Sequence, residues 1–214
     1  MSDQLPTDSR IEVQRQASRG SYDREAIYEI LDAAPFCTVG FIDDGRPVTI
    51  PTIHVRVDDT LVLHGSPASR MLRLLKKGSE VSIAVTLLDG LVLARSVFNH
   101  SMNYRSVVLF GTATVIDDPE RKLEAMRRFT ENILPGRWAD ARRPTDKEFR
   151  ATSMLGVPID AASAKIRSGP PNDEPEDMNL PVWAGVIPYR LERGTPVQAP
   201  DQSTDIPLPP YLAT

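Results

Sequence analysis

The segment from His64 to Val85 combines hydroxyl, guanidinium and backbone donors where a strand gives way to a helix. Its sequence, HGSPASRMLRLLKKGSEVSIAV, predicts a strand end, a loop of small residues, a short helix and a returning strand. A loop that enters a helix offers unpaired N–H groups and the positive end of the helix dipole, and Ser66, Ser69 and Arg70 add polar donors beside them. The pattern therefore predicts a phosphate-binding loop and a nucleotide-like ligand.

Three histidines could also transfer a proton or bind a metal ion: His54, His64 and His100. Their spacing matches no metal-binding motif, and no Asp or Glu accompanies them in a ligand pattern, so we expect no metal site. His64 stands at a predicted strand end facing the phosphate loop. It is interpreted equally well as a ligand contact or as a hydrogen-bonded residue at the rim. For His54 and His100 a structural role is the simpler interpretation.

Several common catalytic and nucleotide-binding motifs do not occur in the chain. It contains no Gly-x-Ser-x-Gly pentapeptide of a serine hydrolase, no Gly-x-Gly-x-x-Gly fingerprint and no Walker A loop. Cys37 lies within an apolar run, where we expect a buried, unreactive thiol. The predicted phosphate loop must therefore belong to a fold outside the Rossmann and P-loop classes.

Composition limits the expected partners and cellular setting. The 214 residues fit one domain of ordinary size with a segment left over. The formal net charge of -4 and the lack of a basic stripe argue against nucleic-acid binding. The single cysteine excludes an intramolecular disulfide, and no apolar leader or unbroken long apolar stretch is seen. We expect a soluble cytoplasmic protein with no nucleic-acid or membrane partner.

The elements that position the phosphate loop can be predicted from apolar periodicity. Ser21 or Asp23 caps a helix that ends before Pro35. Three β-branched runs joined by short turns follow, which predicts an antiparallel meander. Pro51 in the second run cannot donate to a sheet ladder, so it indicates an edge strand, a bulge or a rim open to a ligand.

Further strands and helices follow the phosphate loop. A short helix over 68–77 leads to the runs VSIAVTLL and LVLARSVF, separated by an Asp89-Gly90 turn, and to YRSVVLFGTATVI. Helices are predicted over 119–134 and 145–153, before two late strands, LGVPID and SAKIR. Six strands with one brief helix inserted indicate a mainly β fold with flanking helices and suit a small closed barrel better than alternating βαβ units.

Four segments together resemble a known family: RGSYDREAIYEIL, VTLLDGLVLARS, HSMNYRSVV with the FG that follows, and LPVWAGVIP. They are similar to the pyridoxamine 5′-phosphate oxidase-like flavin-binding split-barrel family, in particular its nitroimidazole-resistance (Nim)-type branch, over roughly residues 19–188. The resemblance implies a six-stranded split β-barrel that binds FMN. With it we divide the chain into an N-terminal arm (1–20), the FMN-binding split-barrel domain (21–190) and a Pro-rich C-terminal tail (191–214).

The resemblance also implies a homodimer with two FMN sites at the interface, each lined by both chains. In such a site the ring of the flavin, the isoalloxazine, lies over the strand formed by Thr49, Ile50, Pro51, Thr52 and Ile53. The ribityl chain and phosphate lie near His64, Gly65 and Ser66, and the phosphate is held by Ser69 and Arg70. From across the interface the flavin is reached by Arg105 and Ser106, and it is bordered by Trp183.

Two departures argue against oxidation of pyridoxamine phosphate itself. The family's Arg-Lys pair at the phosphate loop is Arg70-Met71 here, and the C-terminal substrate-phosphate motif has no counterpart. The resemblance favours an FMN-dependent oxidoreductase acting on a small (nitro)aromatic or quinone-like compound, with His64 or His100 as candidate proton donors. The alternatives are a flavin-binding module for storage or sensing without turnover, and a relative that binds haem or deazaflavin.

Overall fold

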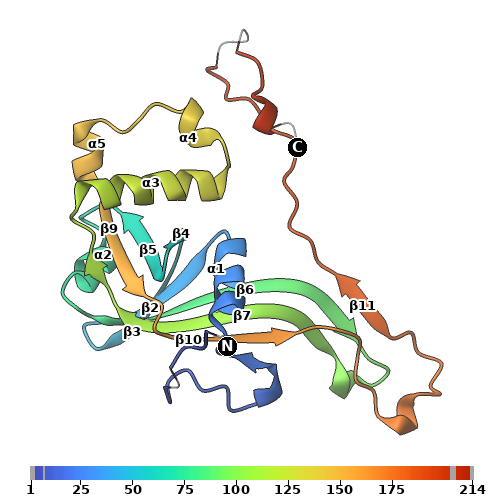
Figure 1. Ribbon diagram of the computed structural model, residues 1–214. Coiled ribbons are helices and arrows are strands. Elements are labelled where there is room, and N and C mark those ends of the chain that lie inside the picture. The colour runs from blue at the N-terminus through green and yellow to red at the C-terminus, as the bar shows by residue number, and fades with distance from the viewer. Residues whose placement is uncertain (1–2, 7, 203–205, 213–214) are drawn as a thin grey trace.

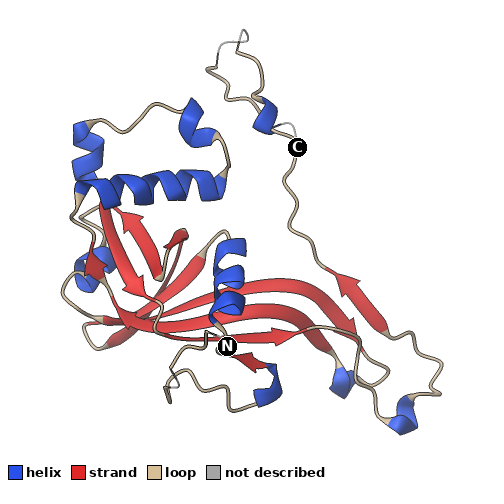
Figure 2. Ribbon diagram, in the orientation of Figure 1, coloured by secondary structure: helices blue, strands red, loops and turns tan. Residues whose placement is uncertain are grey.

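The computed structural model describes residues 3–6, 8–202 and 206–212, and its strands form two antiparallel sheets (Figures 1 and 2). The larger sheet has the order β1 (Gly20–Ser21), β10 (Ala161–Arg167), β7 (Ser101–Thr112), β6 (Glu80–Leu93), β2 (Cys37–Asp43) and β3 (Arg46–Thr52), and β11 (Gly185–Pro188) pairs with β6. The smaller sheet has the order β4 (His54–Val57), β5 (Thr60–Gly65), β9 (Ser153–Pro158) and β8 (Thr114–Val115). The fold is mainly β with flanking helices, as the sequence predicts.

Five α-helices and four 3-10 turns complete the described elements. The helices are α1 (Arg24–Ala33), α2 (Arg70–Leu75), α3 (Pro119–Ile133), α4 (Arg137–Asp140) and α5 (Asp146–Ala151), and the turns are η1 (Ala17–Arg19), η2 (Val97–Asn99), η3 (Pro175–Asp177) and η4 (Pro210–Leu212). Within the described part of the chain, none of these helices has the length and apolar character that crossing a bilayer requires.

Helix α1 forms where the sequence predicts it and supplies the centre of the main core. Asp23 caps it, because its carboxylate accepts a hydrogen bond from the Ala26 N–H (3.0 Å). Ile27, Ile30 and Leu31 are buried on one face of the helix and pack with strands from both sheets. The helix therefore joins the two sheets through a shared apolar core.

The long β6–β7 hairpin differs from the prediction at Asp89-Gly90. Instead of a turn, the structure has a β-bulge, because the register shifts between Leu88 and Gly90 while β6 continues to Leu93. A Cβ at Gly90 would lie 2.9 Å from Ile187 O and 3.0 Å from Val186 Cγ1, so the close approach of β11 requires glycine there. The turn prediction was wrong because a Gly beside an Asp is also the composition of a bulge.

Strand β3 is the outer strand of the larger sheet, so of the alternatives that Pro51 leaves open the structure shows an edge strand. Pro51 lies opposite Thr38 of β2, and the other side of β3 pairs with no described strand. An edge strand leaves backbone N–H and C=O groups free of the ladder. Those groups are available to a ligand.

Strand β5 is buried on both of its faces. Leu61 and Leu63 belong to the core around α1, whereas Val62 belongs to a second cluster with Phe129 of α3 and Met154 of β9. Alternating side chains of one strand therefore contribute to two separate cores. This double burial fixes the direction in which the chain leaves β5.

The last described residues form an extended tail that returns to α4. Leu191 and Val197 are almost fully exposed, as expected for a segment rich in proline. Near its end, the Tyr211 hydroxyl donates to Asp140 Oδ2 (2.5 Å) and accepts from Arg137 Nη1 (3.2 Å). Figure 1 shows the tail leaving β11 as an extended segment, and the next described element is η4.

Candidate functional site

The predicted phosphate loop lies between β5 and α2. The Ser69 N–H donates to Ser66 O (2.9 Å), and Ser66 Oγ accepts from the Ala68 N–H (3.2 Å), so the loop is a tight turn. The Ser69 side chain makes no capping hydrogen bond to α2. The first backbone bond into the helix runs from the Arg73 N–H to Ser69 O (2.9 Å), which leaves the N–H groups ahead of it without an intrahelical acceptor. The loop therefore offers both hydroxyl and backbone donors to an anion.

Arg70 stands at the start of α2 with its side chain half-exposed. Its only described ion pair is a long one, from Nη1 to Asp43 Oδ2 at 3.5 Å. Asp43 ends β2 opposite Arg46, the first residue of β3. The guanidinium therefore remains largely free to bind an anion, and the contact draws the start of α2 towards one end of β3.

The predicted ring-binding strand presents alternate residues to opposite faces. Ile50 packs against the main core, whereas Thr49 and Pro51 are exposed on the outer face of the sheet. Thr52 is partly buried like Ile50, and Ile53 follows the strand. Side chains of Thr49 and Pro51 can therefore meet a ligand on the outer face, while Ile50 can contribute only backbone groups there.

His64 lines a cavity of about 390 Å³ together with Ile53. Its ring packs against Phe129 with the ring centroids 4.3 Å apart. Nδ1 is buried and has no hydrogen-bond partner among the described residues. Burial lowers the pKa of His64 below its ordinary value, so the imidazole is neutral near pH 7. A neutral imidazole with a free ring nitrogen can bind a metal centre or accept a proton.

The walls of the His64 cavity come from elements that the sequence analysis treated as flanking helices. Besides Ile53 and His64, its apolar side chains are Met126, Phe129, Ile133, Trp138, Pro144 and Met154. They come from α3, α4, the segment before α5, and β9. No local motif could have identified them, because residues far apart in sequence meet only when α3 packs over β4, β5 and β9.

The other two histidines lie in different surroundings. His54 is fully buried, and its Nε2 is 2.9 Å from Leu31 O, so it is a structural residue, as the sequence indicates. His100 precedes β7, and its Nδ1 accepts from the Ala94 N–H (3.1 Å). It lies at the far end of a hairpin whose first strand, with 14 residues, spans about 45 Å. Within a single chain, His100 therefore lies far from the phosphate loop.

Arg105 and Ser106 lie in the middle of β7 and point to opposite faces of the sheet. Arg105 forms a two-bond ion pair with Asp89, at 2.7 and 3.0 Å. Ser106 Oγ donates to Lys165 O (3.2 Å) and shares the outer face with Thr49 and Pro51. Only Ser106 of this pair therefore lies on the same face as the exposed part of β3.

Trp183 lies in the segment before β11. Its ring is 64% exposed and stacks close to Gly185, where a Cβ would lie 2.9 Å from the indole. Because β11 pairs with residues 90–93 of β6, Trp183 belongs to the distal part of the β6–β7 hairpin. The predicted residues thus form two groups, one along β3 and the phosphate loop and one along the hairpin.

Cys37 is buried at the start of β2, as predicted. Burial raises the pKa of its thiol to about 12, which keeps the thiol protonated and unreactive at neutral pH. In the described residues no three His, Cys, Asp or Glu side chains converge as they would around a metal ion.

The family model described as pyridoxamine 5′-phosphate oxidase matches residues 23–166, which contain both sheets' central strands and the phosphate loop. The chain belongs to this family. No curated protein matches it in sequence.

Solved structures of similar proteins cover nearly the whole chain. The flavocytochrome Anf3 from Azotobacter vinelandii is 40% identical, with a TM-score of 0.90 over 96% of this chain and 95% of its own. A FAD and haem binding protein from Mycobacterium smegmatis is 42% identical, with a TM-score of 0.86 over 90% and 95% of the two chains. A proposed 5-nitroimidazole antibiotic resistance protein from Bacteroides thetaiotaomicron is 26% identical, with a TM-score of 0.58 over 69% and 86%.

Two desolvated histidines, the buried His54 and the partly buried His64, make the stability of this family member depend on pH. Desolvation lowers the pKa of both His54 and His64 in the folded chain, whereas in the unfolded chain both titrate near the ordinary value of about 6.5. Their contribution to stability is therefore present above that pH and is lost as the pH falls below it. We expect the free energy of unfolding to drop by up to about 1.4 kcal/mol per pH unit for each histidine.

Urea unfolding between pH 7.5 and 5.5 measures this dependence. The variant His54→Gln keeps a donor for Leu31 O but cannot be protonated, so its unfolding free energy should fall less steeply than that of the native chain. The carboxylates Glu124 and Glu148 have lowered pKa values and titrate below this window. Equal slopes for the variant and the native chain would contradict the assignment.

Proposed function

We propose that this chain is a flavin-binding oxidoreductase that also holds a haem, with His64 as the ligand of the haem iron. The observation that carries the proposal is the neutral, partly buried imidazole of His64, whose Nδ1 has no described partner and whose cavity is lined mainly by apolar side chains. Support comes from two solved structures with 40% and 42% identity, described as a flavocytochrome and as a FAD and haem binding protein.

The three histidines differ in their fitness to bind iron. An iron-bound imidazole needs one nitrogen free of hydrogen and a proton on the other. His100 already uses Nδ1 as an acceptor, so its proton lies on Nε2, and His54 uses Nε2 towards Leu31 O inside a closed core. His64 alone among them combines a partnerless nitrogen with a cavity. These contacts favour His64 over the other two.

The donors of the phosphate loop fit the phosphate end of a flavin. Ser66, Ser69 and Arg70 supply hydroxyl and guanidinium groups, and the first turn of α2 supplies N–H groups without intrahelical acceptors. The edge of β3 supplies backbone groups for the polar rim of a ring. FMN, which the sequence favours, and FAD, which the second of the similar structures is described as binding, share these requirements, and we propose FAD for this chain.

A bound flavin exchanges a hydride or single electrons, and a bound haem exchanges single electrons. The chain's own residues control access and charge. Phe129, Trp138 and Met154 line the cavity with apolar surface that limits water around His64. Burial keeps His64 neutral, which preserves a ring nitrogen for coordination. His64 is two residues before Ser66, so both proposed sites are held by the same end of β5.

We also propose that the chain forms a homodimer through the outer face of the larger sheet. That face exposes Ile42, Leu88 and Val108, which are 58%, 49% and 38% accessible, and between them stand the smaller exposed residues Ala84 and Thr86. Exposed apolar side chains on a flat sheet face are typical of a surface that binds another protein. Thr49, Pro51 and Ser106 lie on the same face, so a second copy there would border the proposed flavin site.

The acceptor of the electrons is a second question. A small nitroaromatic or quinone-like compound is favoured by the 26% identity to the proposed nitroimidazole-resistance protein. In that case His64 would relay a proton instead of binding iron, because its neutral ring can accept a proton at one nitrogen and release one from the other. Presence or absence of haem separates the two roles.

The absorption spectrum of the purified protein tests the main proposal. We expect flavin bands together with a Soret band, and FAD in the extract separated by chromatography. His64→Ala should lose the Soret band and retain the flavin bands, because the loop and β3 are unchanged, whereas His100→Ala should retain both. A native protein with flavin bands alone would refute the haem assignment and favour the oxidoreductase without haem. A native protein with neither would refute the proposal.

A double substitution tests the phosphate loop. Ser69→Ala with Arg70→Ala removes one hydroxyl and one charged donor and should weaken flavin binding by roughly 2–5 kcal/mol, as expected for lost charge-assisted hydrogen bonds. Arg73→Ala with Ser79→Ala removes the same residue types outside the loop and serves as the control. Fluorescence titration of flavin into the stripped protein measures the affinities. Equal affinities for the two double variants would exclude the loop as the phosphate site.

Sedimentation tests the dimer. Val108→Glu places a charge on the outer sheet face and should convert the native dimer into monomers with weaker flavin binding. Val115→Glu makes the same change at a residue of equal exposure, 40% against 38%, on β8 of the smaller sheet and should leave the dimer intact. A native monomer that keeps stoichiometric flavin would contradict the proposed interface.

A further inference from the structure

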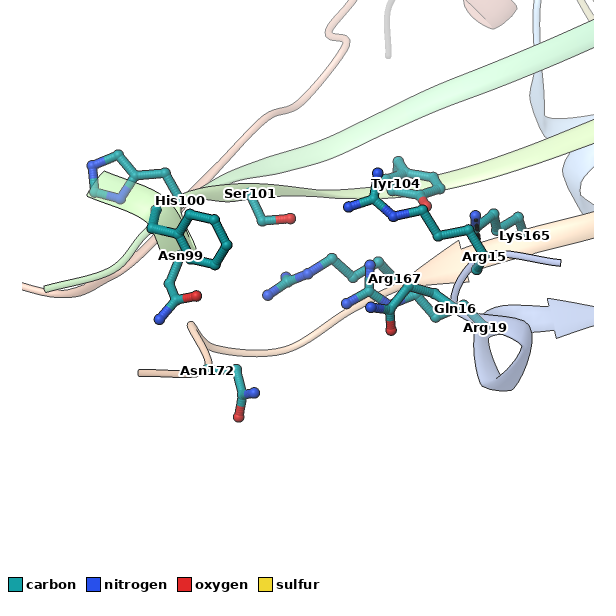
Figure 3. Close-up of a pocket in the computed structure, with 11 residues that line it drawn as sticks. Arg15, Gln16, Arg19, Asn99, His100, Ser101, Tyr104, Lys165, Arg167 and Asn172 are labelled. Carbon is teal, nitrogen blue, oxygen red and sulfur yellow. Dashed lines mark hydrogen bonds between the residues drawn. The ribbon is translucent and has the colours of Figure 1, made fainter. Parts of the chain in front are cut away.

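A second pocket, of about 490 Å³, lies away from His64 at the distal part of the β6–β7 hairpin. Its walls are the N-terminal segment around Arg15 and Arg19, the end of β10 with Lys165 and Arg167, and the start of β7 with Tyr104. Figure 3 shows the side chains of Arg15, Arg19 and Arg167 extending towards the turn that carries Asn99. We refer to it as the basic pocket.

The charges of the basic pocket are unbalanced. Its described lining includes four cationic side chains and no Asp or Glu. None of the four forms an ion pair with a described residue. Most of the other described arginines do, with an acidic side chain at 2.5–3.6 Å. Asp173 follows the lining residue Asn172, but its carboxylate is committed to the Arg95 N–H (2.6 Å) and Nη1 (2.7 Å).

Arg167 is the most informative of the four cations. It is 8% exposed, and Nε is buried without a partner among the described residues. Its other nitrogens donate only to neutral oxygens, those of Asn103, Gly169 and Pro170. Burial, together with the positive charge of Arg19, lowers the pKa of the Arg167 guanidinium. A buried charge without a counter-ion is costly, so the pocket lacks an anion that would complete it.

The fold brings these cations together although Arg15 and Lys165 are 150 residues apart in the sequence. Lys165 Nζ donates to Arg15 O (2.8 Å) and fixes the N-terminal segment against β10. Gln16 adopts φ 57°, a left-handed conformation that costs a non-glycine residue energy, and this bend precedes η1 and Arg19. On β10, Lys165 and Arg167 project to the same face as Tyr104 and Ser106 of β7.

We propose that the basic pocket binds the pyrophosphate group of an adenine dinucleotide. Four cations exceed what a single carboxylate requires, and about 490 Å³ exceeds the space that a lone phosphate fills. The proposal deepens the proposed function and rests on it for the identity of the ligand, the nicotinamide dinucleotide that reduces the flavin, because the phosphate of the flavin itself is assigned to the loop at Ser66, Ser69 and Arg70. Guanidinium groups bind the pyrophosphate in the bidentate manner that suits phosphate oxygens.

Titration with ADP by isothermal calorimetry tests the basic pocket, using the protein as purified and the same protein stripped of flavin. The test variant is Arg15→Gln with Arg19→Gln, which leaves buried Arg167 in place and should fold normally. The matched control is Lys147→Gln with Arg150→Gln, which removes the same charge from exposed positions of α5. We expect ADP affinity to fall by roughly ten- to a hundredfold in the test variant and to stay unchanged in the control.

The same titrations separate the two dinucleotides. If the nicotinamide dinucleotide is the ligand, ADP and NADPH bind the protein as purified, and the test variant weakens both while keeping its flavin. If ADP binds only the stripped protein, and the test variant loses affinity for FAD but not for FMN, the pocket belongs to the flavin and the proposal is overturned. It is also overturned if ADP binds neither form, or if it binds the test variant as tightly as the control.

The outcome is also separable from that of the proposed function. A purified protein with no flavin or haem absorption whose ADP binding depends on Arg15 and Arg19 keeps the basic pocket and refutes the proposed function. A protein that carries both cofactors but shows no ADP binding in either form refutes the basic pocket alone.

Discussion

The double burial of β5 is the constraint on which the functional geometry depends. Leu61 and Leu63 face the core around α1, while Val62 faces the cluster beneath α3, so the strand cannot rotate or slip without exposing one of the two apolar sets. His64 continues the alternation of Val62 and therefore reaches Phe129. The same strand end then delivers Ser66 and the turn into α2. A single rigid element thus sets the position of both the imidazole and the predicted phosphate donors.

Charge pairing distinguishes the functional candidates from the paired arginines of the surface. Arg127 and Arg142 pair closely with Glu124 and Glu148, and such exposed pairs contribute little to stability. Arg70 has only a long contact with Asp43, and the cations of the basic pocket have no described acidic partner. The chain carries a net charge of -4, so an excess of positive charge at these two places is local. Unneutralised cations in a chain with surplus carboxylates indicate sites that bind anions.

Family membership fixes the fold more firmly than it fixes the ligand. The phosphate loop, the edge strand β3 and the exposed sheet face suit any flavin nucleotide, because all of them share a phosphate and a planar ring. Two features of this chain lie outside these parts: the cavity beneath α3 with His64, and the basic pocket at the distal hairpin. Function has to be argued from such sites, because one fold can host many functions.

The sequence by itself determined the local elements and the loop. Helix α1 with its Asp23 cap, α3 after Asp118-Pro119 and the late strands β9 and β10 all follow from short-range periodicity and capping, which depend on neighbours within a few residues. The bulge at Gly90, the cavity of His64 and the basic pocket were decided only by tertiary structure. Gly90 is required by the approach of β11, His64 meets Phe129 across 65 residues, and Arg15 meets Lys165 across 150. Contacts between residues so far apart in the chain produce no local motif or periodicity, so a single sequence does not reveal them.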